Sequence, residues 1–204
     1  MNTAHKFGAR MVLAGCFVQA AGSVCYGQLF MIDPLAPRTY LGIAAVSGNG
    51  QIVVGTSDAV VPAEAFLWTR TTGRQDWLPA GYWSSQTGGI SPEGRFTVGV
   101  AASTPSAYFA YRRELATGQV LPLGNMPRFP NSIATAASSN GEIVVGRGLR
   151  GTGSGHSESD VSVAVRWDSA GVPTPLGYLR PTGSYSDARA VTPDGTTIVG
   201  ASYD

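Results

Sequence analysis

The sequence has very few of the residues that metal sites, disulfides and covalent catalysis require. It contains two cysteines, Cys16 and Cys25, two histidines, His5 and His156, and one lysine, Lys6. All of them except His156 lie near the N-terminus. The rest of the chain therefore cannot build a disulfide framework or a multi-histidine zinc site, and it has no lysine for a Schiff base or a phosphate loop. We accordingly predict no cofactor.

Charge is also scarce, because charged residues make up 13% of the chain and the formal net charge is +1. Once Lys6 and Arg10 are set aside, the remaining basic residues, all arginines, nearly balance the 13 acidic residues. Nucleic-acid-binding surfaces are usually strongly basic. The composition therefore predicts no nucleic-acid partner.

The N-terminal residues have the three-part pattern of a secretory signal. Lys6 and Arg10 precede an apolar, small-residue run over 11–27. A membrane anchor is the alternative, but the run is short for a span and is diluted by Gly, Ser and Gln. We predict a signal peptide over 1–27, a periplasmic or extracellular location, and no membrane span after cleavage. The candidate cleavage points follow Ala20, Ser23 and Gly27.

A second interpretation of the same segment comes from "LAGC", residues 13–16, which matches the lipid-attachment box of bacterial lipoproteins. There Cys16 would become the acylated first residue. The apolar stretch between Arg10 and the box is too short for a normal leader core, so we expect conventional cleavage instead.

One hairpin pattern occurs four times in the remaining chain. Each copy has a polar Ser/Thr-x-x-Gly turn, a short β-branched strand and a glycine at the end of that strand, for example "SGNGQIVVG" before Thr56. The final glycines, which we call the closing glycines, are spaced 44, 47 and 54 residues apart, as in propeller blades. The closing glycines are Gly55, Gly99, Gly146 and Gly200.

Each full copy continues with two more strand patterns. An alternating apolar stretch with aromatic residues follows at 64–69, 107–112 and 163–168, and then a glycine turn and a strand rich in Leu and Pro. Four short antiparallel strands make a propeller blade. We predict an all-β, β-propeller-like array of four-stranded antiparallel blades within 28–204, with about three full units and a partial fourth. The expected units are 38–80, 81–125, 126–180 and 181–204.

The fourth copy lacks the aromatic and Leu-Pro strands. Residues 28–37 read like a Leu-Pro strand, so we expect them to contribute to completing the fourth unit, as N-terminal strands do in closed propellers. Even so, one strand is missing, and an uncovered edge favours association. The sequence therefore predicts an oligomer or another partner at an open edge strand.

Residues 44–69, "AAVSGNGQIVVGTSDAVVPAEAFLWT", resemble the HAF repeat of bacterial extracellular proteins, and the resemblance extends over about 29–204. It rests on several motifs that recur in order: an Ala-rich strand, Ser-x-Asn/Asp-Gly, Val-Val-Gly and Ala-Phe-x-Trp. It implies a secreted or surface propeller-like protein and carries no catalytic residues. The second copy departs from the pattern, because Tyr111 aligns with the Trp.

Two groups of residues are candidate sites. His156, Glu158 and Asp160 lie in a Gly/Ser-rich insertion and would supply metal ligands or acid and base groups, although we favour a linker. Aromatic residues Trp77, Tyr82 and Trp83 lie at a junction between units and would stack on a sugar ring or anchor a partner protein. Packing between neighbouring blades is the alternative that we favour for them.

These observations predict a secreted or cell-surface scaffold with a binding or structural role toward a protein or glycan partner. The alternative is an extracellular hydrolase acting on glycans, which needs only two suitably spaced carboxylates. No pair is marked out by the sequence, so we expect a protein that is not an enzyme. A truncated product without a function of its own is the third interpretation.

Overall fold

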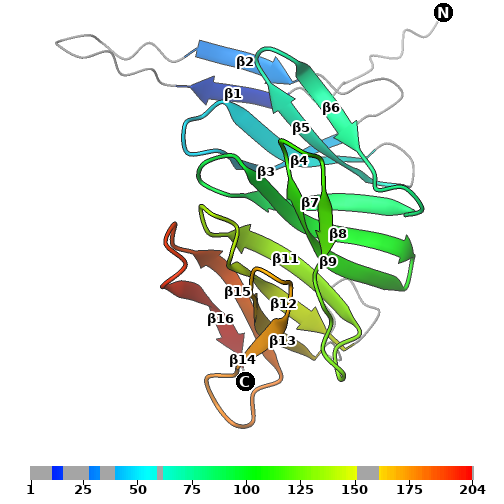
Figure 1. Cartoon of the computed structure of the whole chain (residues 1–204), viewed down its shortest axis with the longest axis vertical. Coiled ribbons are helices and arrows are strands. Elements are labelled where there is room, and N and C mark those ends of the chain that lie inside the picture. Colours follow the sequence, from blue (N-terminus) through cyan, green and yellow to red (C-terminus); the bar gives the residue numbers. More distant parts are fainter. Residues whose placement is uncertain (1–10, 16–27, 33–39, 59–61, 151–160, 204) are drawn as a thin grey trace, which may run out of the picture.

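The described chain is an array of antiparallel β-sheets stacked along the long axis of the molecule (Figure 1). The described residues contain no α-helix, and so none that could cross a membrane. The predicted all-β architecture is thereby confirmed. The computed structural model describes residues 11–15, 28–32, 40–58, 62–150 and 161–203.

Unit 1 is a four-stranded antiparallel sheet whose strands follow chain order. Its turns are tight because Gly50 and Gly73 adopt φ of 71° and 67°, a region that disfavours side chains with a Cβ. The strands are β3 (Tyr40–Val46), β4 (Ile52–Asp58), β5 (Glu64–Thr69) and β6 (Gly73–Trp77).

Unit 2 repeats this sheet with the same strand order. Its first hairpin turns at Gly94, which has φ of 72°. The strands are β7 (Ser84–Ile90), β8 (Phe96–Thr104), β9 (Ala107–Glu114) and β10 (Val120–Pro122).

Unit 3 has four strands and unit 4 has two, which agrees with the predicted partial fourth copy. A single parallel bridge between Ser162 and Tyr185 joins the two units into one six-stranded sheet. The strands of unit 3 are β11 (Asn131–Ala137), β12 (Val144–Leu149), β13 (Ser162–Trp167) and β14 (Pro173–Gly177). Unit 4 consists of β15 (Tyr185–Val191) and β16 (Ile198–Tyr203).

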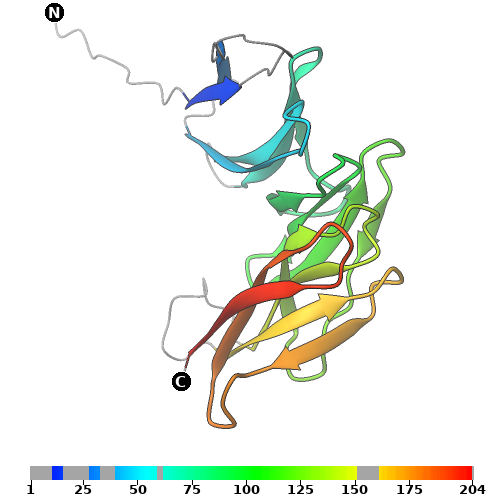
Figure 2. The same ribbon diagram turned by 90° about the vertical axis from the view of Figure 1, so that its left-hand side faces the viewer.

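Strands β1 (Met11–Gly15) and β2 (Gln28–Ile32) form a separate antiparallel pair. Ile32 is buried against Leu41 and Phe66, so this pair lies beside unit 1, at the opposite end of the array from β16 (Figures 1 and 2). In this structure β2 therefore pairs with β1 and not within unit 4. The other residues of the predicted leader, 1–10 and 16–27, lie outside the described residues.

The closing glycines lie at a β-bulge that all four units share. In each unit the register between the first two strands shifts immediately after the residue that pairs with the closing glycine. A Cβ atom on Gly55, Gly99, Gly146 or Gly200 would lie 2.1, 2.0, 2.0 or 1.9 Å from a carbonyl oxygen of the first strand. The repeated glycine is thus required by close backbone approach, which sequence patterning alone does not reveal.

The register also corrects one alignment. Tyr111 pairs with closing glycine Gly99 in the same way that Phe66 pairs with Gly55. The residue in register with Trp68 is Arg113, because these two pair with the equivalent residues of β4 and β8. Tyr111 therefore corresponds to the Phe of the motif, and its ring is fully buried between sheets.

A serine on the first strand links units 2, 3 and 4 to the unit before. Ser186 accepts a hydrogen bond from the Ala164 N–H at 2.8 Å and donates to the Gly177 carbonyl at 2.7 Å, so it bridges β13 and β14 where their register shifts. Ser85 and Ser132 accept equivalent bonds, from the N–H groups of residues 65 and 110. These buried side chains fasten consecutive units through backbone groups.

Replacing Ser186 by alanine is expected to lower the free energy of unfolding by about 2 kcal/mol, because the buried Ala164 N–H loses its partner. Urea unfolding followed by circular dichroism measures this change. Ser103→Ala is the matched control, since Ser103 is exposed and makes one hydrogen bond to a backbone carbonyl. An equal loss in both variants would contradict the structural role assigned to Ser186.

Candidate functional site

Of the three residues in the predicted aromatic site, Trp77 and Tyr82 pack against other rings and Trp83 is exposed. The Trp77 ring lies 4.9 Å from that of Tyr111, and the Tyr82 ring lies 4.9 Å from that of Phe109. Both partners belong to β9, so the Trp77 ring joins unit 1 to unit 2, and the Tyr82 ring packs the segment before β7 onto unit 2. Trp83 is 39% exposed and is the most accessible of the three.

The electrostatics at this junction are those of a buried contact. Burial raises the pKa of the Tyr111 hydroxyl well above its usual value. The Arg113 guanidinium lies 4.7 Å from the centre of the Trp77 ring, and burial lowers its pKa. The Tyr111 hydroxyl therefore stays protonated at neutral pH.

The second predicted site, His156, Glu158 and Asp160, lies outside the described residues. Within the part of the chain that is described, no three His, Cys, Asp or Glu side chains come close enough to hold a metal ion.

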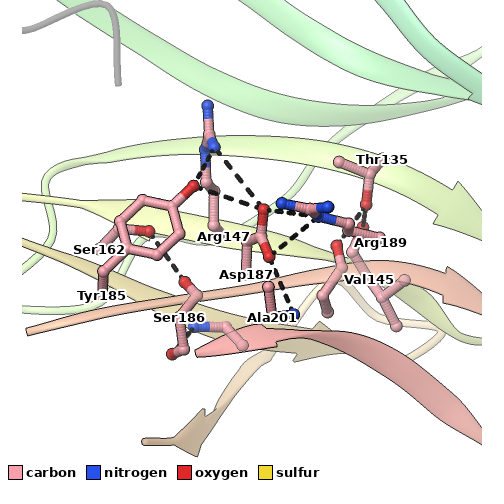
Figure 3. Close-up of polar contacts among 11 residues, drawn as sticks. Thr135, Val145, Arg147, Ser162, Tyr185, Ser186, Asp187, Arg189 and Ala201 are labelled. Atoms are coloured by element: carbon pink, nitrogen blue, oxygen red, sulfur yellow. Dashed lines mark hydrogen bonds and ion pairs between the residues drawn. The ribbon is translucent and has the colours of Figure 1, made fainter. Parts of the chain in front are cut away.

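A charged cluster that the sequence analysis did not identify joins units 3 and 4 (Figure 3). Asp187 of β15 accepts a hydrogen bond from Arg189 Nε at 3.1 Å, and its carboxylate lies 4.0 Å from Arg147 Nη1 of β12. The Tyr185 hydroxyl accepts from Arg147 at 2.9 Å and donates to Asp187 at 3.4 Å. The backbone N–H of Ala201 also donates to Asp187, at 3.1 Å.

The cluster acts as a clamp between strands. The buried Asp187 carboxylate is surrounded by donors, and its hydrogen bond raises the pKa of Arg189. The donors around Asp187 all belong to units 3 and 4, so its carboxylate joins the strands of these two units. The sequence does mark Asp187, because unit 4 has a carboxylate at a position where the other units have uncharged residues. The equivalent residues in units 1, 2 and 3 are Gly42, Gln86 and Ile133.

The accessible surface most unlike the rest of the array is at unit 4. Val199 precedes closing glycine Gly200 and is 57% exposed, whereas its counterparts Val54, Val98 and Val145 are all 0% exposed. Val145 is buried against unit 4, in a cluster with Ala188. Among the described residues no unit covers Val199 in this way.

A groove of about 370 Å³ runs along this surface, between β16 and the end of β14. Ser202 Oγ at its rim accepts a hydrogen bond from the Leu179 N–H at 3.1 Å, so the segment after β14 is tied to β16. Leu179 is 87% exposed, and Leu176 and Tyr203 are also exposed. The groove therefore combines polar groups of the strand edge with uncovered apolar side chains. Its apolar lining includes Leu176, Leu179, Ile198 and Val199.

Neither protein-family models nor curated proteins match the chain. Several solved structures have a similar fold. A TolB-type protein from Agrobacterium tumefaciens matches 86% of this chain and 57% of its own, with a TM-score of 0.57 and 16% identity. TolB from Acinetobacter baumannii matches 87% of this chain and 46% of its own, with a TM-score of 0.51 and 12% identity.

The tricorn protease matches 86% of this chain and 16% of its own, with a TM-score of 0.55 and 12% identity. The chain thus spans about half the length of the TolB structures and a smaller part of tricorn. At these identities the similarity concerns the fold and not the activity. The chain has a β-propeller-like fold, with three complete four-stranded units and a partial fourth.

Proposed function

We propose that this chain is an exported scaffold of the HAF-repeat type that binds a partner through the surface of unit 4. The observation that carries the proposal is the exposure of Val199, at 57%, where three equivalent valines are buried. Uncovered apolar side chains around a hollow characterise interaction sites. The recurrent motifs support the HAF-repeat assignment, and the leader pattern supports export.

The same proposal assigns the polar groups of the described region a structural task. Asp187 and the linking serines use their hydrogen bonds to join units. A stiff array of this kind displays surfaces without needing a reaction centre. Among the described residues, no structural observation favours the glycan hydrolase.

The binding role is tested with a photo-crosslinking residue at position 199, in cells that export the full chain. A matched control carries the same residue at position 172, because Val172 is 55% exposed but lies outside the groove. We expect one discrete higher-mass adduct from position 199 and none from position 172. Adducts at both positions, or at neither, would contradict a binding surface at unit 4.

Export is tested in the same cells by intact mass. We expect the chain outside the cytoplasm to begin after Ala20, Ser23 or Gly27. An uncut chain retained in the cytoplasm would reject export and leave the crosslinking result to stand by itself.

A further inference from the structure

In the three complete units, the outer edge of the second strand is covered by the third strand of the same unit. In units 1, 2 and 3 the second strand pairs on one edge with the first strand and on the other with the third, which are β5, β9 and β13. In unit 4, β16 pairs with β15, and no described strand pairs with its other edge. The free edge of β16 is thus the counterpart of three edges that this chain covers itself.

The third strand also contacts the fourth strand of the preceding unit. The ring of Tyr111 packs on Trp77 at the end of β6, and Trp167 Nε1 donates a hydrogen bond to the Gly124 carbonyl just after β10, at 2.8 Å. At unit 4 the equivalent surface is β14 and the residues after it. There Leu176 and Leu179 are exposed. The groove therefore lies where a third strand would be seated.

The chemistry of that strand can be read from the occupied positions. In unit 1 the Phe66 ring lies over Gly55, so that a Cβ on this glycine would come within 2.8 Å of the ring. The same position is Tyr111 in unit 2, and both rings are buried. In unit 3 the buried Val165 occupies this position, in register with Gly146. The position over Gly200 therefore suits a large apolar side chain, which is an aromatic ring in units 1 and 2.

We propose that the groove beside β16 binds an extended segment of a partner protein with the pattern of these third strands. The segment pairs antiparallel with β16, places an aromatic side chain over Gly200 and covers Val199. This inference rests on the proposed binding function and specifies its partner. A second folded copy cannot donate a third strand, because β5, β9 and β13 are each paired on both edges within the chain. Pairing of β16 with the β16 of a second copy is the alternative that the dimer test below addresses.

The probe is a fluorescein-labelled peptide with the sequence of residues 64–77, which spans β5 and β6. Fluorescence anisotropy with the full chain should give a Kd on the order of 10 μM. Hydrogen exchange should slow at residues 198–203 when the peptide is present. A peptide carrying Phe66→Ala and Trp68→Ala should lose binding, because it keeps the backbone but lacks the rings.

The Val199→Asp chain should bind the peptide about tenfold more weakly, because an apolar contact is replaced by a charge. The Val172→Asp chain is the control and should bind normally, since both positions are exposed and neither change disturbs a core. Failure of the peptide to bind, or equal weakening by both variants, would overturn the proposal. So would a dimer of the chain alone that Val199→Asp dissociates. A crosslink at position 199 without peptide binding would retain the binding surface and reject the strand.

Discussion

Replacing Gly146 by alanine is expected to destabilise the chain by about 4 kcal/mol or more and to remove cooperative unfolding at 37 °C. The added Cβ would lie 2.0 Å from the Ile133 carbonyl oxygen and 2.9 Å from Ala134 Cα. Both are backbone atoms of the paired strand, so relief requires the bulge to open. Circular dichroism during urea unfolding measures the loss.

Gly118→Ala is the control for this prediction. Gly118 has φ of 73° in the turn between β9 and β10, and a Cβ there would meet no atom within 4 Å. Gly118→Ala should therefore lower the free energy of unfolding by only about 1 kcal/mol, through backbone strain alone. If the two substitutions were equally harmful, the close approach of the backbone would not account for the closing glycines.

Trp167→Ala is expected to lower the free energy of unfolding by about 3 to 5 kcal/mol. The Trp167 ring is fully buried in the cluster that joins units 2 and 3, beside Leu121 and Leu123. Truncation would leave a cavity between the sheets and also leave the Gly124 carbonyl without its donor. Thermal unfolding followed by circular dichroism is the measurement.

Two further substitutions separate the contribution of ring packing from that of the hydrogen bond to Gly124. Trp167→Phe keeps most of the ring and loses the hydrogen bond, so we expect the free energy of unfolding to fall by about 1 to 2 kcal/mol. Trp83→Ala should change stability by less than about 1 kcal/mol, because Trp83 is partly exposed. A Trp167→Ala chain as stable as Trp83→Ala would show that the cluster between units 2 and 3 contributes little.

The hairpins and the strand count of each unit could be predicted from the sequence because their causes are local. Turn glycines such as Gly50 and Gly94 are needed where φ is positive, and apolar alternation marks the strands. Four copies of one pattern then indicate an array. The propeller-like fold followed from these short-range features.

The contacts between units could not be predicted in the same way. Ser186 bonds to Ala164 and Asp187 approaches Arg147, and such pairs, 22 residues apart in the first case, depend on how sheets stack. The sequence pattern aligned Tyr111 with Trp68, but in the folded sheet Tyr111 pairs with Gly99 as Phe66 pairs with Gly55, so the alignment was wrong by two residues. Long-range pairing and exact register are properties of the folded array, so sequence periodicity leaves them open.

The linking serines make neighbouring units depend on each other. Ser85, Ser132 and Ser186 each belong to a later unit yet satisfy a buried N–H of the unit before it, so shortening the chain from the C-terminal end would uncover an amide in the unit that becomes last. Dependence also runs the other way, because the Ser85 N–H donates to the Ala63 carbonyl and the Thr87 N–H donates to Thr56 Oγ1. Removing a unit from either end would therefore leave backbone amides without partners in its neighbour, and consecutive units should unfold together rather than one at a time.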